Sequence, residues 1–284
     1  MLRPIELLDL LELGGTTAAA AMALGISQPS VSRRSRQLMQ ELGLPAAGAG
    51  GLRFGESRCL QLLRRACQAH RLEAGAWRLG CSPWLEGVLQ ARQLWSGVPG
   101  RFRQPAAWRE LVAGHALDGA LLSGLDLQLL VPELPAGQRD GVAWQECLLL
   151  PIARVPLGLL LPPASAALPV RWSQVAVPPH PLAPGLATLV RQQQWQCLHP
   201  SATCQAPPAW GQWLRQQNRP TVASPAWAQR LRPHLPDWHW RPWPGALKEQ
   251  HWLLVLRSVW QEHTVWHTLL TDLRAALASD ADSE

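Results

Sequence analysis

Side chains that can bind nucleic acid are concentrated in one short stretch of the sequence, which begins at Ser27 and Gln28. Glutamine can pair with the edge of adenine, arginine with the edge of guanine, and serine with phosphate oxygens. Residues 27–71 contain eight arginines against only Glu41 and Glu56, a net charge of +6. Such an imbalance in a short segment indicates a surface that binds a polyanion. Charge alone also fits a solvated basic face without a partner.

The same stretch has the spacing of a helix-turn-helix, which would present these side chains to DNA. Ala21 is small enough for close packing on the first helix, Gly25 makes the turn, and Val31 locks the second helix against the first. Ser27 caps the second helix, with Pro29 in its first turn, where the missing N–H costs nothing. The start of a recognition helix points into the major groove. The spacing by itself also fits an ordinary helix pair with a glycine turn.

The residues from Gly15 to Arg33, GTTAAAAMALGISQPSVSR, closely resemble the LysR-type transcriptional regulators. In that family an N-terminal winged helix-turn-helix carries a Gly-Ser-Phe-x-x-Ala-Ala stretch that leads to Ser-Gln-Pro-x-(Val/Leu)-Ser. The wing departs from the family pattern of Phe-x-Arg followed by Leu-Thr, and Arg53 is the obvious substitute there. The resemblance implies a DNA-contact set of Thr16, Ser27, Gln28, Pro29, Ser32, Arg33, Arg34, Arg36 and Arg53.

Beyond Gly75 the sequence consists of short apolar runs that alternate with segments of helical periodicity. This alternation indicates α/β architecture. The resemblance implies the full fold class: an α/β protein with an N-terminal all-α winged helix-turn-helix, a linker helix, and a two-lobed α/β domain like a periplasmic binding protein. The expected bounds are about 1–55 for the winged helix-turn-helix, 56–74 for the linker helix and 75–278 for the effector domain. Lobe I would take about 75–153 and 241–278, and lobe II about 154–240.

The resemblance also places a small-molecule site in the cleft between the two lobes. Its expected effector-binding residues are Ser82, Trp84, Gln104 and Ser224. Ser82 precedes a proline and is typical of a helix N-cap, and a helix start that faces a cleft can bind an anion. Few charged groups lie near these loops in sequence, and Arg154 is one of them. We therefore expect an organic anion, such as a carboxylate metabolite, as the ligand class, with a cleft filled by tryptophan as the alternative.

Composition excludes several other classes of protein. In 284 residues, 47% are apolar, so disorder over most of the chain is excluded. No uninterrupted apolar stretch is long enough for a membrane span, and the six cysteines are spaced too irregularly for a disulfide framework, so a cytoplasmic location is expected. Phosphate loops, nucleophile elbows and paired-carboxylate motifs are missing, so neither an enzyme nor a cofactor is predicted. Two groups of His and Cys residues could be considered as zinc ligands: His263 with His267, and Cys197-x-His199 with Cys204. Neither has the full set of ligands close in sequence that a zinc site needs, so no zinc site is predicted.

The sequence therefore predicts a sequence-specific, DNA-binding transcriptional regulator that responds to a small-molecule effector. Its expected partners are double-stranded DNA, the effector, further copies of itself in a homodimer or homotetramer, and RNA polymerase as a candidate. A membrane is not among them. One alternative is a small-molecule-binding module whose DNA-binding domain has decayed, because the wing is altered. A second alternative is an enzyme on the same two-lobed scaffold.

Overall fold

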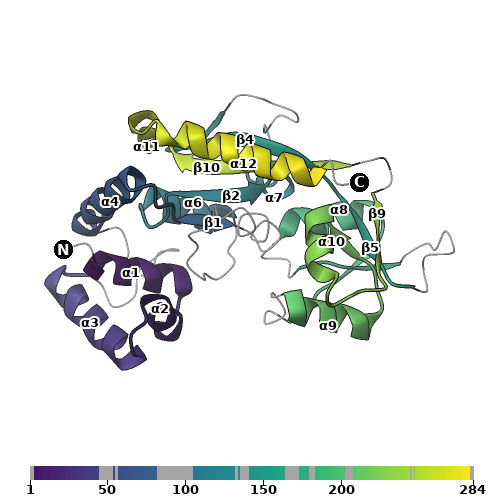
Figure 1. Cartoon of the computed structure of the whole chain (residues 1–284), viewed down its shortest axis with the longest axis horizontal. Helices are drawn as coiled ribbons and strands as arrows, with labels where there is room; N and C mark the ends of the chain where they lie inside the picture. The colour runs from purple at the N-terminus through teal and green to yellow at the C-terminus, as the bar shows by residue number, and fades with distance from the viewer. Residues whose placement is uncertain are drawn as a thin grey trace.

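The computed structural model describes residues 3–44, 54, 57–81, 105–131, 134, 141–163, 173–178, 183–201, 207–243, 245 and 247–281. The first three helices form a small bundle at one end of the molecule, seen in purple at the left of Figure 1. They are α1 (Arg3–Gly14), α2 (Thr17–Leu24) and α3 (Gln28–Glu41). Their core contains Leu8, Leu11 and Val31, all nearly inaccessible to solvent.

Local signals set the bounds of α2 and α3. The Thr16 hydroxyl accepts a hydrogen bond from the Ala19 N–H at 3.1 Å and so caps α2. Gly25 ends α2 with a φ of +64°, a left-handed conformation that glycine adopts without strain. Ser27 caps α3, and Pro29 lies in the first turn of that helix. The helix-turn-helix predicted from the sequence is confirmed.

The predicted linker helix is α4 (Arg58–Glu73), which begins after its cap Ser57. One face of α4 packs inward, where Leu60, Cys67 and Leu72 are buried together with the polar side chains of Arg64 and Gln68. The wing predicted between α3 and α4, including Arg53, lies outside the described residues except for Phe54. The Phe54 side chain is buried in the core of the helix bundle.

Lobe I is built on a five-stranded mixed sheet whose strand order is β1-β2-β10-β4-β3. Strand β10 runs antiparallel between β2 and β4, so residues far apart in the sequence form the centre of the sheet. Helices α6 and α12 pack against its strands. The elements are β1 (Leu79–Cys81), α6 (Pro105–Ala113), β2 (Gly119–Ser123), α7 (Gly124–Gln128), β3 (Val142–Trp144), β4 (Cys147–Pro156), β10 (Lys248–Leu256), α11 (Arg257–Glu262) and α12 (Val265–Ala281).

Lobe II has a second five-stranded sheet with the order β7-β6-β8-β5-β9. Helix α8 packs on one face through Leu186 and Val190, whereas α9 and α10 pack on the other through Trp210 and Trp227. The elements are β5 (Gly158–Leu161), β6 (Gln174–Ala176), α8 (Pro184–Gln192), β7 (Gln196–Leu198), α9 (Pro207–Gln217), β8 (Thr221–Ala223), α10 (Pro225–Leu231) and β9 (His239–Pro242).

The chain crosses between the two sheets twice. It leaves the first sheet at Leu157 and returns between β9 and β10. Strand β4 runs without a break from Cys147 to Pro156, directly before the first crossing. The reason is the long pairing of β4 with β10, which extends to the partners Lys248 and Pro156. Sequence pattern alone does not show how far a pairing extends.

Buried charged side chains join the helix bundle to α4. The Arg64 Nε atom lies 2.7 Å from Asp9 Oδ1, and its Nη2 lies 3.3 Å from Glu12 Oε2. All three side chains are at most 1% exposed. A buried ion pair persists only when each charge has partners, and here one arginine of α4 bridges two carboxylates of α1.

The same network continues into lobe I through Arg78. Its Nη1 lies 2.6 Å from Asp9 Oδ2, and its backbone N–H donates to Asp118 Oδ2 at 2.7 Å. Asp118 also pairs with Arg71 of α4 at 2.6 Å. The buried members of the network are three arginines (Arg64, Arg71, Arg78) and three carboxylates (Asp9, Glu12, Asp118), and the half-exposed Glu6 lies 4.0 Å from Arg78 at its edge.

We predict that Arg64→Met lowers the free energy of unfolding by about 3–5 kcal/mol, because it leaves Asp9 and Glu12 buried with too little positive charge. The control is Arg65→Met, whose pair with Glu262 is about half exposed on both sides and is worth at most about 1 kcal/mol. Urea denaturation of both variants measures the difference. Equal losses in the two variants would contradict the proposed role of the network.

Candidate functional sites

The N-termini of α2 and α3 meet at one exposed surface. The Gln28 side chain at the start of α3 donates a hydrogen bond from Nε2 to Thr17 Oγ1 of α2 at 2.9 Å. Thr16, Ser27 and Pro29 are exposed around this contact. Each helix start carries unpaired backbone N–H groups and the positive end of a helix dipole, so the surface is suited to phosphate.

The exposed side of α3 continues this surface away from the helix start. Arg33 is exposed, and no hydrogen bond or ion pair joins it to any described residue. Arg36 is also exposed, and its guanidinium donates to the backbone carbonyl oxygen of Ser32 at 3.2 Å. Val31 and Ser35 lie on the opposite, buried side. The exposed polar side chains of α3 are therefore separated from those that hold the helix in the bundle.

Arg34 lies on a different side of α3 from the rest of the predicted DNA-contact set. It lines a groove with Glu6 of α1 and with Gln37 and Glu41 of its own helix. The structure thus brings Thr16, Ser27, Gln28, Pro29, Ser32, Arg33 and Arg36 to one region and places Arg34 on its flank. The predicted residues Arg53, Ser82, Trp84 and Gln104 lie outside the described residues.

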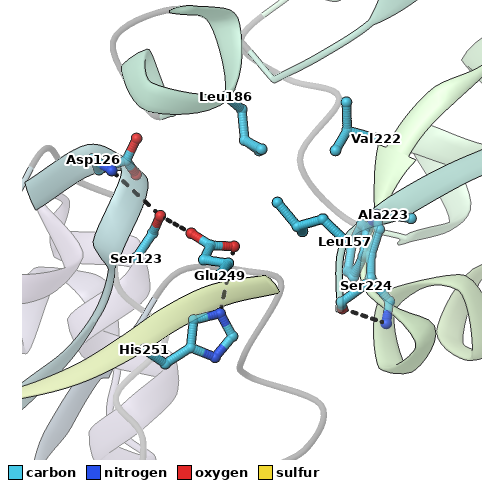
Figure 2. Close-up of a pocket in the computed structure, with 10 residues that line it drawn as sticks. Ser123, Asp126, Leu157, Leu186, Val222, Ala223, Ser224, Glu249 and His251 are labelled. Atoms are coloured by element: carbon cyan, nitrogen blue, oxygen red, sulfur yellow. Dashed lines mark hydrogen bonds and ion pairs between the residues drawn. The ribbon is translucent and has the colours of Figure 1, made fainter. Parts of the chain in front are cut away.

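A pocket lies between the two lobes, where the chain crosses from one sheet to the other (Figure 2). Ser224, the described member of the predicted effector set, lines it and caps α10 by accepting the Trp227 N–H at 3.2 Å. The enclosed volume is about 30 Å³, enough for a few water molecules or a small polar group. The lining residues are Ser123, Asp126, Leu157, Leu186, Val222, Ala223, Ser224, Trp227, Glu249 and His251.

A polar network forms the lobe I side of this pocket. The Ser123 hydroxyl donates to Glu249 Oε1, and the other Glu249 oxygen lies 3.5 Å from His251 Nε2, as Figure 2 shows. His251 Nδ1 is buried and has no hydrogen-bond partner among the described residues. The Glu249 carboxylate lies between the Ser123 hydroxyl and the His251 imidazole. This order differs from that of a catalytic triad, in which the imidazole contacts the nucleophilic hydroxyl directly.

Asp126 connects the two lobes at the edge of the pocket. Its Oδ1 accepts the Gly185 N–H at the start of α8 at 2.8 Å. A side chain at Gly185 would overlap the backbone of Leu125, so glycine permits this close approach. Burial raises the pKa of Asp126 to about 7, with a smaller rise from nearby Glu249, although the Gly185 hydrogen bond acts in the opposite direction.

Of the polar residues that line the pocket, Ser224 alone was predicted as a site residue from the sequence. Asp126 belongs to one of two Leu-Asp pairs that resemble a family feature, Leu117-Asp118 and Leu125-Asp126, but that resemblance did not assign it to the ligand site. Ser123, Glu249 and His251 lie in or at the end of strands that read as ordinary apolar runs. Only the strand pairing of His251 with Ser123 brings them together.

The described lining of the pocket carries two carboxylates and one imidazole, and no described arginine or lysine lines it. This part of the site favours a ligand that donates hydrogen bonds or carries positive charge. The described residues hold no group of three or more His, Cys, Asp or Glu side chains placed to bind a metal ion. His267 instead packs edge-on against Trp260.

The fold is similar to that of solved OxyR structures. A full-length OxyR variant from Pseudomonas aeruginosa matches 100% of this chain and 98% of its own with a TM-score of 0.55 at 12% identity. An OxyR cysteine mutant from Corynebacterium glutamicum matches 99% of this chain and 92% of its own with a TM-score of 0.51 at 12% identity. No protein-family model matches the sequence, and no curated protein matches it. Among the described helices, none is both long and apolar enough to cross a lipid bilayer.

We predict that Asp126→Asn removes a pH dependence of stability. The pKa of about 7 in the folded protein exceeds the ordinary 3.8, so the stability contributed by the protonated carboxyl is full below about pH 4 and is lost as the pH rises to about 7. One pKa unit of difference between the folded and unfolded states corresponds to about 1.4 kcal/mol. The variant, which keeps an acceptor for Gly185, should therefore gain stability over wild type across this range.

Thermal unfolding measured from pH 4 to pH 8 tests this prediction. The control is Asp237→Asn, because Asp237 is exposed. A constant difference between Asp126→Asn and wild type over the whole range would contradict it.

Proposed function

We propose that this chain is a LysR-type, DNA-binding transcriptional regulator, not an enzyme, and that it responds to a small ligand held between its two lobes. The observation that carries the proposal is the surface at the start of α3. There the N-terminus of α2, Gln28 and two exposed arginines, Arg33 and Arg36, face solvent together. No described acid forms an ion pair with these arginines, so they are available to DNA.

The groups on this surface have complementary tasks in DNA binding. Backbone N–H groups at the two helix starts suit phosphates, which fix the register of the protein on the duplex. Gln28 uses one N–H for Thr17 and keeps its carbonyl oxygen and second N–H for an adenine edge. Arg33 can make a bidentate contact with guanine. The start of α3 would thus lie in the major groove.

Oligomer formation is the second element of the proposal. Helix α4 carries an exposed apolar stripe that includes Cys59, Leu62 and Ala66, spaced three and four residues apart. Leu62 is 53% exposed and is one of the few large apolar side chains on the described surface. A second copy of the chain would cover this stripe, as a homodimer or homotetramer on a partly palindromic site requires. RNA polymerase remains a candidate partner, and the cytoplasm is the proposed location.

The rival function is a small-molecule-binding module that no longer binds DNA. It is motivated by the altered sequence of the wing around Arg53. Selection of bound genomic fragments with the purified protein, followed by titration at several salt concentrations, separates the two functions. Salt-dependent binding to duplex DNA supports the regulator, whereas failure to bind any fragment supports the rival.

We predict that Arg33→Ala weakens specific DNA binding by about 1–3 kcal/mol, as expected for loss of a bidentate base contact. Stability should barely change, because Arg33 is exposed and Val31 and Ser35 hold the helix. Titration at fixed salt against a selected fragment measures the loss. Arg191→Ala, an exposed arginine of lobe II, is the control and should bind as wild type does. Unchanged affinity of Arg33→Ala would remove Arg33 from the interface.

We predict that Leu62→Glu converts the oligomer to smaller species, because a charge replaces an apolar side chain at the centre of the interface. The control is Leu129→Glu at the end of α7, since Leu129 is similarly exposed at 47%. Sedimentation measures the mass of both variants. If Leu62→Glu keeps the wild-type mass, the oligomer does not form through α4.

The ligand class can be tested with two sets of compounds, organic acids and small amines, in a thermal-shift assay. An acid that stabilises wild type but not Ser82→Ala supports the organic anion predicted from the sequence. An amine that stabilises wild type but not Glu249→Gln supports the class that the described lining favours. The loss at either position should be about 1 kcal/mol or more per hydrogen bond removed.

A further inference from the structure

The net positive charge of this protein is concentrated in lobe II. Residues 157–247, which the chain contributes to lobe II, contain seven arginines and a single acid, Asp237, a net charge of +6. The whole chain also has a net charge of +6, so the remaining residues sum to zero. Charge of one sign on one lobe destabilises that lobe by self-repulsion and attracts polyanions.

Several of these arginines lie together at the end of lobe II that is distal to the pocket. Helix α10 begins at Ser224 beside the pocket, and Arg230 and Arg232 lie at its far end. Helix α9 ends near Arg215, and Arg219 follows before β8. We name these four arginines, together with His234, the distal basic surface.

The two helices that carry this surface are in contact. A Cβ atom at Gly211 of α9 would lie 2.6 Å from the Cβ of His234, which follows α10. Arg215 is one helical turn beyond Gly211 on the same side of α9. The arginines at the ends of α9 and α10 therefore form one patch rather than two.

Three arginines of the patch have no acidic partner among the described residues. No described acid forms an ion pair with Arg215, Arg219 or Arg232, and Arg215 and Arg232 are exposed. Arg230 stacks over the Trp227 ring, with its guanidinium carbon 5.6 Å from the ring centroid. Unpaired guanidinium groups have planar donor arrays that match phosphate oxygens.

We propose that the distal basic surface binds the phosphates of the same DNA duplex that α3 recognises, independently of base sequence. The inference rests on the proposed function, because it requires that α3 binds DNA. Figure 1 shows α9 of lobe II and α3 of the helix bundle along the same side of the molecule, at opposite ends of its long axis. A duplex that continues beyond the α3 site along this side passes the distal basic surface.

The composition of the patch favours nucleic acid over an acidic protein. Protein interfaces depend on a few large apolar or aromatic anchors at their centre. The large apolar side chains exposed on the described surface are Met22, Leu62, Leu129 and Leu130, and none of them belongs to lobe II. Phosphate contacts need no such anchor, because counterion release drives them.

The test compares a triple variant, Arg215→Gln/Arg219→Gln/Arg232→Gln, with wild type on two duplexes. One is the core of a fragment from the genomic selection, and the other is that core with unrelated sequence on both sides. The control variant is Arg154→Gln/Arg191→Gln/Lys248→Gln. It also loses three positive charges, all from exposed positions outside the distal basic surface. Arg191, for example, lies on α8, which packs on the opposite face of the lobe II sheet from α9 and α10. Hydroxyl-radical footprinting accompanies the titrations.

We expect wild type and the control to bind the flanked duplex more tightly and with a steeper salt dependence than the core. The triple variant should bind the core as wild type does and lose this gain. The slope of log K against log salt should fall by about 0.9 for each phosphate contact removed, so by about 3 in all. Protection of the flanking phosphates should disappear from its footprint.

Three outcomes overturn the proposal, and they are distinguishable. Wild type that binds neither duplex overturns the proposed function and this inference with it. A triple variant with the wild-type slope and footprint on the flanked duplex overturns the inference alone. A triple variant that binds both duplexes normally but fails to regulate transcription by purified RNA polymerase assigns the surface to an acidic protein instead.

Discussion

The arrangement of this protein depends on a buried cluster of balanced charges. Asp9 accepts from Arg64 of α4 and from Arg78 of lobe I, so a single carboxylate of α1 joins three parts of the chain. Asp118 repeats the arrangement with Arg71 and the backbone of Arg78. Removal of one member leaves its partners charged and buried, which costs far more than loss of a surface pair. The helix bundle is therefore held against lobe I by buried ion pairs, which are stable only when the charged groups stay in close contact.

This cluster is connected to the pocket by a single short strand. Asp118 directly precedes β2, and Ser123 is the last residue of that strand. One end of β2 therefore touches the charge cluster and the other end touches the polar network with Glu249 and His251. Asp126, three residues further on, holds the start of α8 in lobe II. A ligand that separates or closes the lobes would thus act on residues adjacent in the chain to those that hold the helix bundle.

Charge is distributed unevenly over the molecule, and this bears on both proposed surfaces. The pocket carries carboxylates, whereas the basic groups lie outside it, on α3 and at the distal end of lobe II. In a protein that binds DNA, carboxylates are best kept away from phosphates, and the carboxylates of Asp9, Glu12 and Asp118 in the charge cluster are buried away from solvent. Recognition by α3 and electrostatic attraction by lobe II would then make separate contributions to affinity.

The sequence by itself determined the helix-turn-helix, because its signals are local. Thr16, Gly25 and Ser27 act within one turn of the helices that they cap or end, so their residue types predict the element bounds. Only the tertiary structure decided the pocket and the charge cluster. Glu249 meets Ser123 because β10 pairs with β2, and Arg78 meets Asp9 because lobe I packs beside α1. Such contacts join residues distant in sequence, and no local pattern specifies which strands or helices will become neighbours.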